Sequence, residues 1–321
     1  MEAKEKSILL IIPFFGKWPI WFDAHLKSIE FNSTINWLIP TDCEIPENHP
    51  SNIKFLQMSF EEMNTIFNER LGFKVHLNYR KFCDLKPTYA YVFEDYISNY
   101  DFWGFCDMDI IWGDIRKYMN QDVLEKYDII SSRKKAISGH FNIFRNTEKT
   151  KFLYRNIQDY ENLLATSKLT RFDENLLTEI LKENDRGLNT KWDEILCNQY
   201  KGIDSHQEYY INKVIWKNGS VYSLDKSYNL NEVMYLHFIN WKRTMTRCDV
   251  IESDTDSFYI SFNKIHLIKQ PVWIEYLNSV KNLFNGYWIK ENRRINKNKI
   301  KSLLKRVKRK LIKIITFSNE N

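Results

Sequence analysis

The sequence is poor in glycine and cysteine, and both residue types are scattered along it. Nine glycines occur among 321 residues, and no two of them form a Gly-x-Gly pair. The glycine-rich phosphate loops of dinucleotide-binding and P-loop folds are therefore missing. The five cysteines include no Cys-x-x-Cys pair, which argues against zinc ribbons, ferredoxin-type clusters and thioredoxin-type redox sites. Such a set of thiols is typical of a reducing compartment.

The chain also has no long apolar run. The longest near its start, Ile8 to Phe15, contains Pro13, whereas a membrane-spanning helix needs about 20 apolar residues. That run leads into a Gly-Lys-Trp sequence instead of a small-residue cleavage site, so we expect no secretory signal and a cytoplasmic protein. His-Glu-x-x-His and Gly-x-Ser-x-Gly are missing as well, which disfavours zincins and elbow-type hydrolases.

The positive charge is confined to one end of the chain. The formal net charge is +6, but residues 290–313 hold 12 Lys and Arg and a single acidic residue. The rest of the chain carries 35 basic and 40 acidic residues, a net charge of −5. Because nucleic-acid binding needs a basic face on the fold itself, we expect no nucleic-acid partner for the folded body.

The first half of the chain alternates short apolar runs with helical patterns. Ser59 and Glu62 have the spacing of a capping box at the start of one helix. The alternation predicts an α/β fold with a Rossmann-type, mainly parallel sheet and helices on both faces. The expected strands are 7–15, 35–40, 53–58, 102–106 and 128–131, and the expected helices are 18–30 and those beginning at Ser59 and Pro87.

Beyond residue 135 the rhythm of the sequence changes. We expect helices at 147–159, 172–182 and 206–217, and strands at 142–145, 233–240 and 259–262.

An Asp-x-Asp pair, Asp107 and Asp109, follows the apolar strand predicted at 102–106. Two carboxylates at this spacing beyond a strand end can share a hard divalent cation, which can neutralise a diphosphate leaving group. A second pair, Asp254 and Asp256, lies between serines and is typical of a solvated turn. The alternative for the first pair is that its aspartates cap a turn.

His237 and Lys242 lie at the end of the strand predicted at 233–240. A neutral imidazole can complete a manganese or magnesium site that carboxylates begin, and a lysine can place a point charge against phosphate. The alternative for His237 is a hydrogen-bonded histidine of the core.

Five segments carry a family resemblance, which covers roughly residues 7–245. Through them the chain resembles nucleotide-sugar glycosyltransferases of the GT-A type. More narrowly, it is similar to an uncharacterised bacterial family of candidate glycosyltransferases from surface-polysaccharide loci such as those for capsule and lipopolysaccharide. The segments are Ile-Ile-Pro-Phe-Phe-Gly-Lys-Trp-Pro (11–19), Thr-Asp-Cys (41–43), Phe-Cys-Asp-Leu-Lys-Pro (82–87), Tyr-Asp-Phe-Trp-Gly-Phe-Cys-Asp-Met-Asp-Ile-Ile-Trp-Gly (100–113) and Leu-His-Phe-Ile-Asn-Trp-Lys (236–242).

The resemblance implies a GT-A-like fold and a set of binding residues. Donor-nucleotide contacts fall on Pro13, Phe14, Phe15, Thr41 and Asp42. Further donor contacts fall on Asp84 and Lys86, the metal ligands would be Asp107, Asp109 and His237, and Lys242 would meet the diphosphate. GT-A enzymes with such a histidine carry Lys-Pro-Trp after it, whereas this chain has Asn-Trp-Lys at 240–242.

An acidic pair, Asp173 and Glu174, opens the helix predicted at 172–182. Several GT-A enzymes have such a pair facing the acceptor, so the resemblance implies a catalytic role for both carboxylates. The alternative is simple stabilisation of a helix N-terminus by acidic residues. The segment 139–142 is a weaker candidate for contact with donor sugar or acceptor.

The basic end of the chain has apolar residues at helical spacing, with Lys and Arg filling the remaining positions of 295–315. This pattern predicts a basic amphipathic helix that docks on an anionic membrane surface. The alternatives are a packed C-terminal helix and contact with nucleic acid.

These observations lead to one hypothesis with two rivals. The chain is expected to be a glycosyltransferase that uses Mn²⁺ or Mg²⁺ and a nucleotide-sugar donor, with a UDP-sugar as the favoured donor. The expected acceptor is a surface glycan or glycolipid at the inner membrane face. Retention of configuration at the transferred sugar is slightly favoured. We expect a donor-binding half at 1–135, an acceptor-binding half at 136–285 and a tail at 286–321. The rivals are a nucleotidyltransferase and an inactive nucleotide-sugar or glycan-binding protein.

Overall fold

The computed structural model describes residues 5–183, 187–198, 214–224, 229–239, 241–250, 255–271 and 296–304, together with 273–274, 276–277, 280, 284 and 293. Its centre is a seven-stranded sheet. In spatial order the strands are β3 (Ile53–Gln57), β2 (Ile35–Thr41), β1 (Ile8–Ile11), β4 (Phe102–Cys106), β7 (Phe141–Arg145), β6 (Ile129–Ser131) and β8 (Thr190–Trp192).

This sheet is mainly parallel, as the sequence predicts. Strands β3, β2, β1 and β4 run parallel to one another, and β6 and β8 pair in parallel too. Only β7 runs antiparallel to its neighbours. The carboxyl ends of β1, β2 and β4 therefore meet at one edge of the sheet, which is where ligands bind in open α/β folds.

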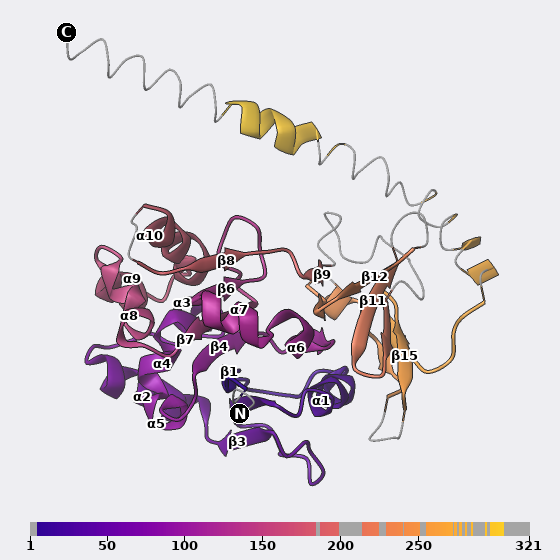
Figure 1. Ribbon diagram of the computed structural model, residues 1–321, viewed down its shortest axis with the longest axis horizontal. Helices are drawn as coiled ribbons and strands as arrows, with labels where there is room; N and C mark the ends of the chain where they lie inside the picture. Colours follow the sequence, from indigo (N-terminus) through magenta and orange to yellow (C-terminus); the bar gives the residue numbers. More distant parts are fainter. Residues whose placement is uncertain are drawn as a thin grey trace.

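Helices cover both faces of the sheet, because successive side chains of a strand point to opposite sides. Ile8 and Leu10 pack on the face covered by α1 (Phe22–Glu30), α6 (Ile115–Tyr118) and α7 (Gln121–Lys126). Leu9 and Ile11 pack on the other face. That face is covered by α2 (Phe60–Leu71), α4 (Tyr89–Val92), α5 (Glu94–Ile97), α9 (Tyr160–Ala165) and α10 (Leu177–Glu183) (Figure 1). The predicted α/β class is confirmed.

Local sequence signals set several helix ends. Ser59 and Glu62 form the predicted capping box of α2: the Ser59 hydroxyl accepts from the Glu62 N–H at 3.1 Å, and the Glu62 carboxylate accepts from the Ser59 N–H at 2.7 Å. The continuous helix expected after Pro87 is divided instead, because Phe93 leaves helical geometry between α4 and α5. Other short helices of the first 180 residues are α3 (Lys81–Leu85), η1 (Lys86–Thr88), α8 (Glu148–Lys151), η2 (Leu153–Asn156) and the π-helical η3 (Phe172–Leu176).

Two smaller sheets complete the fold. One contains β5 (Ile110–Trp112), β13 (Tyr235–His237) and β9 (Leu196–Asn198). The other has the order β12 (Leu230–Val233), β11 (Ser220–Leu224), β10 (Val214–Lys217), β15 (Ser257–Ile260), β16 (Lys264–His266) and β14 (Arg247–Cys248). Figure 1 shows the second sheet in orange at the end of the molecule beyond α1.

The prediction of a helix at 206–217 is wrong for residues 214–217, the part of this range that the structure describes. Val214–Lys217 is strand β10, paired antiparallel with β11 on one side and β15 on the other. Val214 and Trp216 are buried whereas Lys217 is exposed, so the pattern has the period of a strand. Residues 206–213 lie outside the described part of the chain. The strand predicted at 233–240 is shorter than expected and is followed by a turn and by η5 (Trp241–Arg243).

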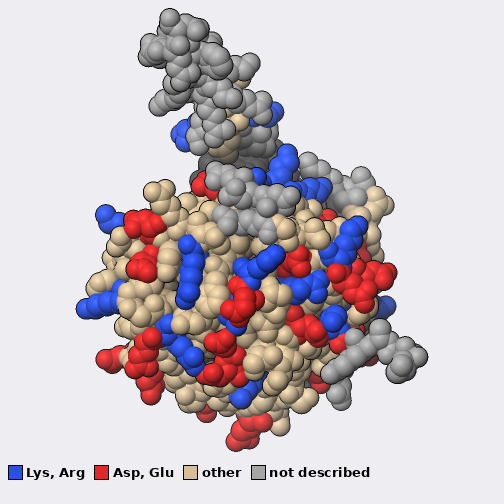
Figure 2. Space-filling view, turned by 60° about the vertical axis from the view of Figure 1, so that its left-hand side comes forward, with Lys and Arg blue, Asp and Glu red and all other residues tan. Residues whose placement is uncertain are grey.

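Only part of the predicted tail helix falls within the described residues. Residues 296–304 are helical and exposed, and the rest of 295–315 lies outside the described part of the chain. Among the described residues, no helix is long and apolar enough to cross a membrane. On the face shown in Figure 2, acidic and basic side chains of the folded body are interspersed.

Candidate active site

A cleft of about 380 Å³ opens at the carboxyl ends of β1 and β4. Its walls come from the loop after β1, from α3 and η1, and from the Asp-x-Asp turn after β4. The residues predicted from sequence that line it are Pro13, Phe14, Phe15, Lys86, Asp107, Asp109 and Lys242.

The Asp-x-Asp turn connects β4 to β5 and is held from both sides. The N–H of Asp107 donates to the His140 carbonyl at 3.1 Å, and the Trp21 indole N–H donates to the Met108 carbonyl at 3.0 Å. The carbonyl of Asp109 accepts from the N–H of Phe238 at 2.9 Å. These bonds fix the backbone of the turn and tie it to the segment that carries His237.

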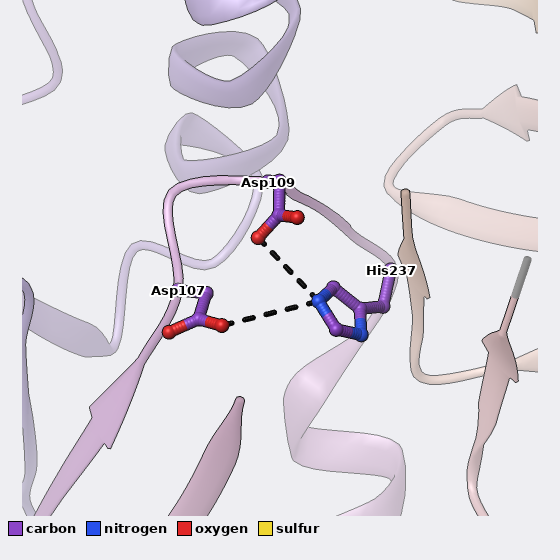
Figure 3. Close-up of side chains that lie close together, drawn as sticks. All are labelled: Asp107, Asp109 and His237. Atoms are coloured by element: carbon purple, nitrogen blue, oxygen red, sulfur yellow. Dashed lines mark ion pairs between the residues drawn. The ribbon is translucent and has the colours of Figure 1, made fainter. Parts of the chain in front are cut away.

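Asp107, Asp109 and His237 converge on one point (Figure 3). His237 Nε2 lies 3.4 Å from Asp109 Oδ1 and 3.9 Å from Asp107 Oδ2, and the facing ligand atoms of all three lie within 4.8 Å of one another. Antiparallel pairing of β13 with β5 sets His237 opposite Ile110 and so brings it beside Asp109. Two carboxylate oxygens and an imidazole nitrogen gathered within this distance form a candidate site for a divalent ion.

Each carboxylate of the turn is also paired with a lysine. Lys86 Nζ lies 2.5 Å from Asp107 Oδ1 and 2.5 Å from the Gly139 carbonyl, and Lys242 Nζ lies 3.0 Å from Asp109 Oδ2. Burial is the largest single influence on Lys86 and lowers its pKa, but the neighbouring acidic groups, with Asp107 first, together outweigh burial and hold the pKa above its usual value. Burial would raise the pKa of Asp109, but His237 and Lys242 hold it well below its usual range. Both lysines and Asp109 are therefore charged at neutral pH.

A second histidine, His140, stacks on the ring of His237. Their ring centroids are 4.0 Å apart and the planes differ by 25°. Burial, followed by the charges of His237 and Arg133, holds the pKa of His140 well below its usual value. A neutral ring thus packs on His237, whose Nδ1 is buried without a hydrogen-bond partner among the described residues.

Asp84 has a different environment from the one expected. Its side chain is fully buried and forms an ion pair with Lys81 at 2.9 Å. The same carboxylate accepts from the N–H and hydroxyl of Thr170 and from the N–H of Phe172 at 2.8–2.9 Å. Asp84 does not line the cleft. Both of its carboxylate oxygens already accept hydrogen bonds from other residues of the chain. Asp84 instead fixes the start of η3 and so positions the acidic pair that follows.

The acidic pair lies in two unlike environments. Asp173 is 3% exposed, and burial raises its pKa to about 8. The charge of Lys86 acts to lower this pKa, and repulsion by Glu174 acts to raise it. Glu174 is more exposed; its carboxylate accepts from the Gly139 N–H at 3.2 Å and pairs with Arg133 at 3.3 Å. Asp173 is therefore largely protonated at neutral pH, whereas Glu174 presents a paired carboxylate.

Thr41 and Asp42 lie beside the cleft and not in its lining. Thr41 is fully buried and accepts from the Cys43 N–H through its hydroxyl at 3.1 Å. Asp42 is exposed and accepts from the Gly16 N–H at 2.6 Å, which joins the loops after β1 and β2. Gly16 has a φ of +111°, a backbone conformation that favours glycine.

Tyr79 and Cys83 are among the lining residues that the sequence analysis did not name as site residues. Tyr79 lines the cleft and is 70% exposed, with its ring 5.2 Å from that of Phe60. A lone tyrosine in a polar loop carries no signal in the sequence. Cys83 also lines the cleft, and burial raises the pKa of its thiol to about 11, so it is a poor nucleophile at neutral pH.

Comparison with known proteins assigns the chain to a family. The model of a family of unknown function, DUF6625, matches residues 10–269, and the chain belongs to this family. No curated protein matches it.

Two solved structures of LgtC resemble the chain distantly. One, a galactosyltransferase in complex with donor and acceptor sugar analogues, is 12% identical with a TM-score of 0.36, over 71% of this chain and 86% of that one. The other, an active-site mutant, is 11% identical with a TM-score of 0.35, over 59% and 75%. Likenesses at this level assign no activity.

Proposed function

We propose that this protein is a metal-dependent glycosyltransferase that uses a nucleoside diphosphate sugar, with UDP-sugar as the first choice. The observation that carries the proposal is the trio of Asp107, Asp109 and His237, flanked by two charged lysines, at the carboxyl edge of a mainly parallel sheet. The sequence resemblance to GT-A enzymes points to the same residues. Together they provide oxygen and nitrogen ligands for a hard divalent ion next to cations that suit a diphosphate.

Each residue of the cleft has a role in this proposal. Asp107, Asp109 and His237 would hold Mn²⁺ or Mg²⁺, which supplies charge neutralisation for the departing diphosphate. Lys86 and Lys242 provide two further fixed positive charges where negative charge develops. Pro13, Phe14 and Phe15 give an apolar wall for the nucleotide, and Thr41 and Asp42 at the neighbouring strand end remain the predicted contacts of the base.

The acidic pair suits two different tasks. A protonated Asp173 can donate a hydrogen bond to a sugar hydroxyl, whereas the Glu174 carboxylate can stabilise positive charge at the reacting carbon or accept a proton from the acceptor. Glu174 is the better candidate for the charged role because its carboxylate is partly exposed and pairs with Arg133. Whether transfer retains or inverts configuration follows from which of these roles Glu174 takes.

The test is calorimetric titration of UDP into the purified protein with and without Mn²⁺, followed by incubation with UDP-sugars. We expect Mn²⁺ to tighten UDP binding by about a hundredfold, and we expect UDP release from at least one UDP-sugar. Binding of UDP without release from any UDP-sugar or acceptor mixture would favour the binding-protein rival. No binding of UDP, GDP or CMP by folded protein would contradict the proposal.

The acceptor side of the proposal involves the tail. We propose that residues 295–315 dock on an anionic membrane surface and bring the cleft to a lipid-linked glycan at the inner face. Within the described part of this segment Ile300, Leu303 and Leu304 are 59–62% exposed, and lysines occupy positions 297, 299 and 301. Exposed apolar side chains beside basic ones are what an interfacial helix presents to anionic lipid.

Sedimentation with vesicles tests the tail. The full chain should pellet with vesicles that contain anionic phosphatidylglycerol, and it should remain in solution with neutral phosphatidylcholine vesicles or at high salt. The double variant Leu303→Glu and Leu304→Glu should lose binding, while Leu169→Glu, at an exposed leucine of the folded body, should retain it. Equal sedimentation of all three proteins would contradict membrane docking by this helix.

A further inference from the structure

The four charges around the Asp-x-Asp turn cancel one another. Asp107 is paired with Lys86 and Asp109 with Lys242, so each carboxylate that could ligate a metal already has a cation beside it. The side chain of Asp109 is 7% exposed and that of Lys86 is likewise 7% exposed. Water screens such buried charges poorly. A divalent ion that entered alone would therefore meet two ammonium groups and leave a net charge of +2.

A diphosphate removes this obstacle. Its oxygens can accept from both ammonium groups and ligate the ion at the same time, and its charge offsets the excess of +2. The ion and the nucleotide together thus bring the cleft close to neutrality, whereas either one alone does not.

We infer that Lys86 and Lys242 act as internal counter-ions that weaken metal binding until a nucleoside diphosphate arrives, so that the metal ion and the nucleotide bind as a unit. This inference rests on the proposed function, which it deepens by assigning the coupling between metal and donor to two residues. It follows from the charges and distances of this cleft.

The two lysines differ in how easily their ammonium groups can move away from the paired aspartates. Lys86 is pinned, because its ammonium donates to the Gly139 carbonyl as well as to Asp107 and lies 5.5 Å from the ring centre of Phe105. Lys242 is 47% exposed and can turn into solvent when an ion approaches Asp109. Lys86 therefore opposes the ion more strongly than Lys242 does.

The experiment measures Mn²⁺ affinity by the electron paramagnetic resonance signal of free Mn²⁺, with and without UDP. Without UDP, we expect Lys86→Met to bind Mn²⁺ about tenfold more tightly than wild type, and Lys242→Met about threefold more tightly. With UDP, wild type should gain about a hundredfold in Mn²⁺ affinity, and Lys86→Met should gain less than about tenfold. The control is Lys117→Met, which removes an ion-paired lysine outside the cleft and should match wild type in both conditions.

The outcomes separate the inference from the function it rests on. If UDP tightens Mn²⁺ binding in wild type but Lys86→Met and Lys242→Met bind Mn²⁺ alone no better than wild type, the inference is overturned and the proposed function stands. If wild type binds neither Mn²⁺ nor UDP under any condition, the proposed function fails as well. Thermal unfolding verifies that each variant is folded, and the half-exposed Lys242 keeps the test open should Lys86→Met misfold.

Discussion

Asp109→Asn is expected to lower transfer from a UDP-sugar by about a thousandfold while the protein stays folded. Among the three candidate ligands, Asp109 and His237 have the most buried side chains. The carboxylate of Asp109 faces both His237 and Lys242. The substitution keeps the shape of the side chain but removes the charge that attracts the ion. Because Lys242 is half exposed, water can solvate it once its partner is neutral, so we expect little loss of stability.

The measurement is UDP release from the UDP-sugar that wild type uses fastest, at saturating Mn²⁺, together with thermal unfolding of both proteins. The matched control is Asp256→Asn, which alters an exposed aspartate of the second Asp-x-Asp pair and should keep full activity. A rate for Asp109→Asn within tenfold of wild type would remove Asp109 from the metal site and would argue for a metal-independent reaction.

Asp84→Ala is expected to reduce the free energy of unfolding by about 3–5 kcal/mol, the usual cost of removing one partner of a buried ion pair. The variant would leave the buried ammonium group of Lys81 without its carboxylate partner. It would also leave the N–H groups of Thr170 and Phe172 without the oxygen that accepts their hydrogen bonds. Because those bonds fix the start of η3, transfer should also fall through misplacement of Asp173 and Glu174.

Urea unfolding followed by tryptophan fluorescence measures this loss. The control is Asp95→Ala, which removes the acidic partner of a surface ion pair with Arg70, where Asp95 is 69% exposed. Such exposed pairs contribute about 0–1 kcal/mol. If the two substitutions cost the same, Asp84 has no special structural role. If Asp84→Ala is fully stable but binds UDP poorly, the result would support the direct donor contact that the sequence analysis expects.

Much of the central sheet could be predicted because its strands are coded locally. The runs that became β1, β2 and β4 are short, apolar and bounded by polar or turn residues, which is typical of strands buried on both faces. The two carboxylates of the Asp-x-Asp turn could be located for the same reason, since they directly follow such a run. Strand β10 could not, because its apolar residues also fit a helical pattern and its pairing with β11 and β15 decides the matter.

The sequence by itself determined the α/β class, the position of the Asp-x-Asp turn at a strand end and the separation of a basic tail from a slightly acidic body. These depend on composition and on neighbours along the chain. Only the tertiary structure decided that His237 faces both carboxylates, that Lys86 and Lys242 neutralise them, and that Asp84 is turned away from the cleft. The pairing of β5 with β13 and the burial of these charges join segments far apart in the sequence, and no local pattern encodes such contacts.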